Sequence, residues 1–139
     1  MRARLLRRHA MPITPVKTLV ARAKDEIVTL PPAEARALAD AGEALLVDIR
    51  DVRELDRDGR IPGAFHAPRG MLEFWVDPES PYHKPPLAEA KRLVLFCASA
   101  WRSALSAKAL QDMGVEGVAE IEGGFKGWRE AGLPVETDG

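Results

Sequence analysis

Residues 93–113 carry the sequence LVLFCASAWRSALSAKALQDM, in which an apolar strand runs directly into a helix. Residues 93–97 are continuously apolar, as are strands of a parallel sheet that is covered on both faces. From Ser103 to Met113 apolar residues recur at helical spacing, and Gly114 ends the predicted helix. A strand followed at once by a helix is the repeating unit of α/β folds.

The same alternation continues on either side of this segment. We predict further strands at 27–30, 45–49 and 117–121, and helices at 14–23, 31–41 and 71–76, with a last helix through Phe125, Trp128 and Ala131. Thr14 is the predicted cap of the first helix, and four prolines make residues 77–86 a predicted loop. The pattern predicts an α/β fold with a mostly parallel central sheet.

Composition excludes several classes of protein. With 139 residues, of which 46% are hydrophobic and 29% charged, the chain is the size of one globular domain. It has no run of 18 apolar residues, which excludes a transmembrane helix. Its single cysteine, Cys97, excludes an internal disulfide and a cysteine-based zinc site.

The formal net charge of −1 hides two oppositely charged regions. Residues 1–24 contain seven Lys or Arg and no acid, so residues 25–139 hold 13 basic against 21 acidic residues, a net charge of −8. An acidic body argues against nucleic-acid binding, and neither membrane binding nor a secretory signal is expected. We interpret the basic tip that precedes Pro12 as a flexible terminus and expect a cytoplasmic protein.

Cys97 is the candidate for chemistry, because ligands of open α/β sheets bind beyond the carboxyl ends of strands. A short loop of small residues follows it, and then a helix begins. Free backbone N–H groups and the helix dipole form an anion cradle there and favour the thiolate form of a cysteine. Arg102 adds a planar positive charge. A buried, inert cysteine at the end of a strand is the alternative.

Four segments, in this order, resemble the single-domain rhodaneses, a sulfurtransferase family. They are Leu46-Val47-Asp48-Ile49-Arg50 with Glu54, residues 59–64 (Gly-Arg-Ile-Pro-Gly-Ala) with His66 and Pro68, the loop Cys97–Ser103, and Gly123-Gly124-Phe125-Lys126-Gly127-Trp128. The resemblance implies a three-layer α/β/α domain over residues 27–136, preceded by a basic tip and a possible flanking helix at 1–26.

The resemblance also implies a reaction. Cys97 would take the outer sulfur of thiosulfate or a similar anionic donor as a persulfide, and a thiol, cyanide or protein thiol would then accept it. Cys97 and Arg102 are the expected catalytic residues, and Ala98, Ser99, Ala100, Trp101, Arg102 and Ser103 the expected substrate-binding residues. No metal or organic cofactor is expected.

A loop residue departs from the family pattern, and several polar and aromatic residues have predicted roles outside catalysis. Ala100 stands where the family has glycine, so a positive φ there would strain the loop. Asp48 and Arg50 are expected to be structural residues near the site. His66 and Trp128 are also expected to be structural, whereas Trp101 is expected to be partly exposed. Tyr82, His83 and Lys84 are interpreted as a solvated loop.

Two further functions stay open beside the sulfurtransferase. The first is a persulfide carrier or regulatory protein-binding module with little turnover on small acceptors. The second is a phosphatase or arsenate reductase, which the spacing disfavours. Four residues separate Cys97 from Arg102, whereas related dual-specificity phosphatases have five.

Overall fold

One parallel β-sheet forms the centre of the molecule. The computed structural model describes residues 12–137, and within them five strands pair in the order β1-β5-β4-β2-β3. Every pairing between these strands is parallel. The strands are β1 (Val28–Leu30), β2 (Leu45–Asp48), β3 (Phe65–His66), β4 (Leu93–Phe96) and β5 (Ala119–Ile121). The helices are α2 (Val16–Glu26), α3 (Pro32–Asp40), α4 (Val52–Asp58), α5 (Leu72–Val76), α6 (Pro85–Glu89), α7 (Arg102–Asp112) and α8 (Gly124–Glu130), with a 3₁₀ turn, η1, at Arg69–Met71.

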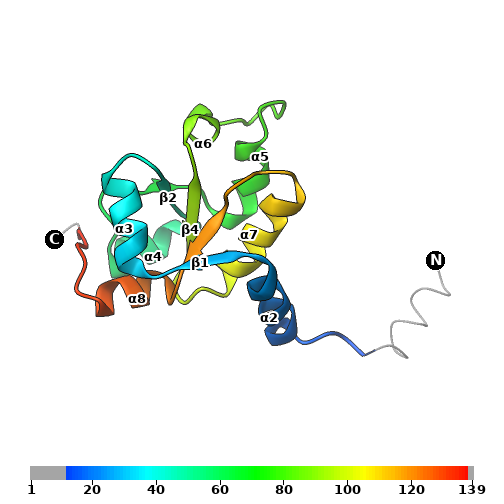
Figure 1. Cartoon of the computed structure of the whole chain (residues 1–139), viewed down its shortest axis with the longest axis horizontal. Helices are drawn as coiled ribbons and strands as arrows, with labels where there is room; N and C mark the ends of the chain where they lie inside the picture. The colour runs from blue at the N-terminus through cyan, green and yellow to red at the C-terminus, as the bar shows by residue number, and fades with distance from the viewer. Residues whose placement is uncertain (1–11, 138–139) are drawn as a thin grey trace.

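Side chains of the central strands alternate between two cores. From β4, Leu93 and Leu95 pack with α5, α6 and α7, whereas Val94 and Phe96 pack with α3 and α8 on the other face. Figure 1 shows these two groups of helices on opposite sides of the sheet. The predicted three-layer α/β/α architecture is therefore confirmed.

Three short elements were not predicted. Helix α4 lies in the charged stretch after β2, strand β3 lies in a turn-rich segment, and α6 overlaps the predicted proline-rich loop. Helix α4 is held by a capping box, in which the Asp51 side chain accepts from the Arg53 amide and the Glu54 side chain accepts from the Asp51 amide. In α6, Pro85 and Pro86 stand in the first turn, where proline is tolerated.

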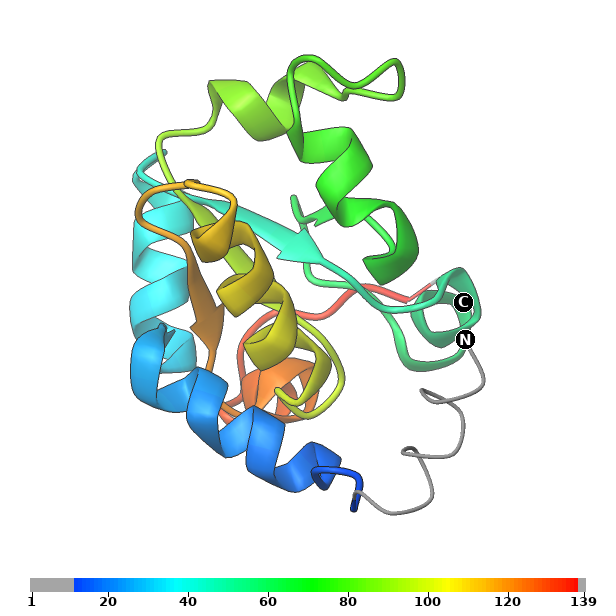
Figure 2. The same cartoon turned by 90° about the vertical axis from the view of Figure 1, so that its right-hand side faces the viewer.

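The N-terminal helix packs on the domain. Val20 and Ala23 of α2 contact Ala104 of α7, and Figure 2 shows the two helices side by side. The predicted helix over residues 14–23 is therefore confirmed, whereas the predicted flexible tip, at residues 1–11, lies outside the described residues. The predicted Thr14 cap is wrong, because α2 begins after Pro15 with no side-chain cap. Within residues 12–137, no helix is long and apolar enough to cross a membrane.

Candidate active site

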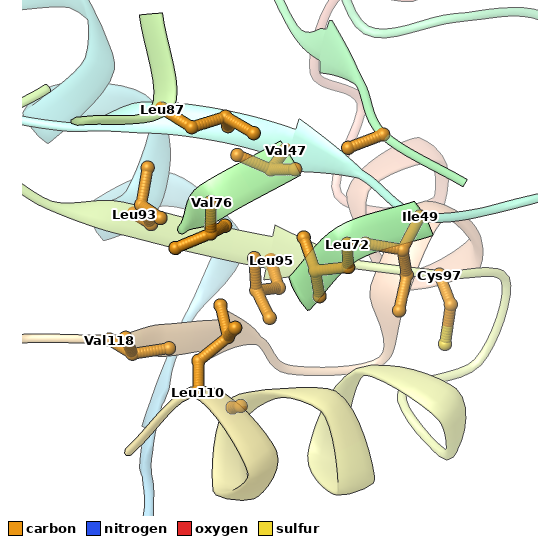
Figure 3. Packing of buried hydrophobic residues seen from close by; sticks show 12 residues of the cluster. Val47, Ile49, Leu72, Val76, Leu87, Leu93, Leu95, Cys97, Leu110 and Val118 are labelled. Carbon is orange, nitrogen blue, oxygen red and sulfur yellow. The ribbon is translucent and has the colours of Figure 1, made fainter. Parts of the chain in front are cut away.

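Cys97 lies directly after β4, at the end of the apolar core. Only 1% of its surface is exposed, and it belongs to the same cluster as Ile49 and Leu95. Figure 3 shows its sulfur beyond Ile49, near the beginning of α7. Cys97 is therefore both a buried residue of the core and the first residue of the loop.

Ser103 is the polar neighbour of the Cys97 sulfur. Its backbone N–H donates to Sγ over 3.4 Å, and its hydroxyl oxygen lies 3.7 Å from Sγ. Ser103 is in the first turn of α7, which begins at Arg102. The first turn of this helix thus directs an amide at the sulfur, in the way that favours a thiolate.

The loop between Cys97 and Ser103 turns sharply at Ala100. The φ of Ala100 is +68°, and it is the one non-glycine residue of the described chain with a positive φ. Ala100 therefore has the positive φ under which strain is predicted for an alanine. Ala100 is buried while Ser99 and Trp101 face solvent, and Trp101 is 46% exposed, as predicted.

Helix α8 is hydrogen-bonded to the start of this loop through backbone groups. The Phe125 amide donates to the Cys97 carbonyl over 2.7 Å, and the Lys126 amide donates to the Ala98 carbonyl over 3.1 Å. A Cβ on Gly124 would lie 2.5 Å from the Cys97 carbonyl oxygen. The Gly-Gly pair was recognised in the sequence as a motif only, and the structure shows that it allows this close approach of two backbones.

Arg102 forms an ion pair instead of standing free. Its two terminal nitrogens donate to the two carboxylate oxygens of Glu54 over 2.8 and 2.9 Å. This hydrogen bonding lowers the pKa of Glu54 to about 2 and, together with nearby Cys97, raises the pKa of Arg102. Arg102 is 43% exposed, so its guanidinium lies at the rim of the loop with its charge largely offset by Glu54.

Asp48 and Arg50 form a buried pair beside the site. They are 2% and 1% exposed, and the Arg50 guanidinium donates to Asp48 over 2.7 Å and to the Gly59 carbonyl over 2.9 Å. The guanidinium also lies 4.1 Å from the centre of the Phe125 ring. The contacts of this pair are those expected for a structural role, because it joins the end of β2 to α8 and to the turn after α4.

The remaining polar and aromatic residues also have structural contacts. The His66 ring Nε2 lies 2.7 Å from the Arg50 carbonyl, and Trp128 is buried with its indole N–H donating to the Pro134 carbonyl. Tyr82 is exposed, as expected for a loop. His83 and Lys84 lie in the same loop and also contact Trp75, the first through the Trp75 carbonyl and the second, which is exposed, over its ring.

A buried carboxylate behind Cys97 was not foreseen from the sequence. Glu120 of β5 is fully buried and accepts a hydrogen bond from the Ser103 hydroxyl over 2.7 Å. Its other oxygen accepts from Lys24 of α2 and from Thr29 of β1, each over 2.8 Å. The signal was an acid inside the apolar run 118–121, at a strand position where burial was expected.

No residues suited to hold a metal ion gather at this site. Within residues 12–137 there is no group of three or more His, Cys, Asp or Glu side chains that could hold one. The expectation that the protein needs no cofactor stays a prediction.

Comparison with known proteins finds a matching family and several relatives. The model of the Rhodanese-like domain family matches residues 31–131. Thiosulfate sulfurtransferase GlpE of Glaesserella parasuis is 29% identical over 81% of this chain and 96% of its own. The uncharacterized protein slr1261 of Synechocystis is 35% identical over 77% of this chain, which spans 55% of that relative's length.

A solved structure extends the comparison to three dimensions. A Rhodopseudomonas palustris protein of unknown function, described as a possible tyrosine phosphatase, has a TM-score of 0.83 and 53% identity, over 91% of this chain and 99% of that one. The family match covers strands β2 to β5 and includes both Cys97 and the α8 segment that supports its loop. The chain therefore belongs to the rhodanese-like family.

Proposed function

We propose that the protein is a sulfurtransferase that moves a sulfane sulfur through a persulfide on Cys97. The donor is thiosulfate or a similar small anion, and the acceptor is a thiol, cyanide or a protein thiol. The observation that carries the proposal is the Cys97 sulfur at the base of the loop, with the Ser103 amide directed at it over 3.4 Å.

The free amides of the loop support the binding of an anionic sulfur. Within residues 12–137, the backbone N–H groups of Ser99, Ala100 and Trp101 donate to no protein acceptor. Such amides next to a helix N-terminus bind anions. We assign them, with Ser103, to the terminal sulfur of the persulfide, and Arg102 to the entrance of the loop.

The reaction has two steps. The Cys97 thiolate attacks the outer sulfur of thiosulfate, a new S–S bond forms, and sulfite leaves with the electron pair of the broken S–S bond. The acceptor then attacks the terminal sulfur, and the electron pair of the second broken S–S bond returns to Cys97 as thiolate. Covalent catalysis of this kind gives ping-pong kinetics.

Thiosulfate and cyanide test the proposal directly. We expect thiocyanate to form, and mass spectrometry of the protein treated with thiosulfate alone to show one added sulfur atom. Cys97→Ser should lose both signals while keeping its circular dichroism spectrum. Absence of the added sulfur and of turnover in the wild-type protein would rule the function out.

A persulfide carrier is the second candidate, and two observations favour it. Cys97 is 1% exposed, so a free acceptor reaches its sulfur only through the loop, whereas the exposed Trp101 beside it offers a contact to a partner protein. The carrier predicts that thiosulfate loads Cys97 but that cyanide and small thiols unload it slowly. Rapid turnover with either would exclude the carrier.

We also propose a cytoplasmic location, since thiols that accept sulfur are kept reduced there. A phosphatase is the competing activity, and hydrolysis of an aryl phosphate by the purified protein would support it. The four-residue spacing between Cys97 and Arg102 makes the loop narrower than that of the dual-specificity phosphatases, and we expect no hydrolysis.

A further inference from the structure

Glu120 is a carboxylate at a buried strand position, where an apolar side chain is expected. It is fully buried on β5 and lies opposite Leu95 of β4, between Ala119 and Ile121, which face the other core. Burying a carboxylate is costly unless it is paired and hydrogen-bonded. Both of its oxygens do have partners, and one of these partners, Ser103, also contacts Cys97.

The directions of these hydrogen bonds are set by chemistry. Glu120 forms an ion pair with Lys24, and a carboxylate in an ion pair only accepts, so the single proton of the Ser103 hydroxyl points to Glu120. The hydroxyl therefore presents only lone pairs to the Cys97 sulfur, 3.7 Å away. Lone pairs accept from an S–H group but do not stabilise a thiolate.

We propose that Glu120 is a positioning residue that acts through Ser103 to oppose negative charge on the Cys97 sulfur. This inference rests on the proposed function for its meaning in the reaction. In the persulfide the negative charge lies on the terminal sulfur, among the loop amides and farther than Sγ from the Ser103 hydroxyl. When an acceptor takes that sulfur, the electron pair returns to Cys97 Sγ, where Glu120 opposes it. Glu120 thus favours the loaded form and slows release.

Other charged groups around Cys97 act from different elements. Lys24 of α2 offsets part of the charge of Glu120, and Thr29 of β1 adds a neutral donor to the same oxygen. At the rim of the loop, Arg102 of α7 is paired with Glu54 of α4. From α8 only backbone amides reach the start of the loop, and they donate to carbonyls. Ser103 is the residue that joins Glu120 to the sulfur.

Glu120→Gln reverses the hydrogen bond to Ser103. Lys24 and Thr29 both donate to one oxygen of Glu120, so the amide oxygen of the glutamine takes that place. The amide nitrogen then donates to the Ser103 hydroxyl, whose own proton becomes free to donate to Sγ. The variant thus removes a buried negative charge and gives the thiolate a second donor.

Alkylation of Cys97 by iodoacetamide across a range of pH tests this without any sulfur transfer. At about pH 6 we expect Glu120→Gln to react roughly five- to tenfold faster than the wild-type protein, because its thiolate is favoured. Above about pH 10 the two rates should converge, since the thiol is then ionised in both. Persulfide loaded by thiosulfate should also pass to cyanide several-fold faster in the variant.

Two control variants distinguish an effect of Glu120 on Cys97 through Ser103 from a loss of the contact between Glu120 and α2. Glu26→Gln breaks a different ion pair of α2, that of Glu26 with Lys108 of α7, and should leave the alkylation profile unchanged. On a Ser103→Ala background, the effect of Glu120→Gln should become much smaller. Equal acceleration at every pH would mean that the site has only opened, and an unchanged effect without Ser103 would mean that Glu120 does not act through it. Either result overturns the inference.

The alkylation and cyanide measurements also test the two proposals separately. If thiosulfate never loads Cys97, the proposed function is lost, but alkylation still reports whether Glu120 opposes the thiolate. If loading occurs and Glu120→Gln alkylates at the wild-type rate at about pH 6, the sulfurtransferase stands and the role of Glu120 does not. A circular dichroism spectrum and a thermal melt of each variant confirm that it is folded.

Discussion

Ala100 holds a backbone conformation that alanine normally avoids. Its φ of +68° lies in the left-handed region, which costs an L-residue roughly 1–2 kcal/mol. Glycine removes this strain, although it also makes the unfolded chain more flexible and deletes a buried methyl group. We therefore expect Ala100→Gly to keep or slightly raise the free energy of unfolding, measured in urea.

The matched control for Ala100→Gly is Ala104→Gly. Ala104 is also buried, but it lies inside α7, where glycine in place of alanine costs about 1 kcal/mol. The two variants make the same chemical change only four residues apart in the chain. If both lost the same free energy of unfolding, the conformation of Ala100 would not be strained, and this prediction would be wrong.

At the level of elements, the contact between α8 and the Cys97 loop depends on Gly124. An alanine there combines a φ of +62° with a methyl group 2.5 Å from the Cys97 carbonyl oxygen. We expect Gly124→Ala to lower the free energy of unfolding by about 2–3 kcal/mol and to change the alkylation rate of Cys97. Gly132→Ala isolates the strain, because Gly132 has a φ of +76° and nothing within 4 Å of its Cβ position. A loss equal to that of Gly132→Ala would show that the close approach has no cost.

The same elements show how far the sequence can predict this fold. Continuous apolar runs predicted β2 and β4, and the apolar spacing predicted α7, because buried strands and long helices leave strong patterns. Helix α4 was missed because, of its seven residues, only Leu55 is buried and its stability comes from the Asp51–Glu54 capping box. Glu120 was missed as a site residue because its partners, Lys24 and Ser103, are brought to it only by the packing of α2 and α7.

For the whole molecule, the Glu54–Arg102 pair joins α4, which follows β2, to α7, which follows β4, across the edge of the sheet that carries Cys97. Arg102 lowers the pKa of Glu54 from its ordinary 4.5 to about 2 in the folded protein, so the unfolded chain takes up the proton first as the pH falls. The pair's contribution is therefore complete above about pH 4.5 and is lost as the pH falls toward 2.

Because Arg102 is partly exposed, we expect Glu54→Gln to cost about 1 kcal/mol of unfolding free energy at neutral pH. In urea titrations over a range of pH, the difference from the wild-type protein should shrink below pH 4.5 and vanish near pH 2. Glu43→Gln, which removes one carboxylate from the exposed pair with Lys91, controls for the loss of a charge and should cost less at neutral pH. A Glu54→Gln difference that stays constant from pH 7 to pH 2 would mean that the ion pair does not stabilise the fold.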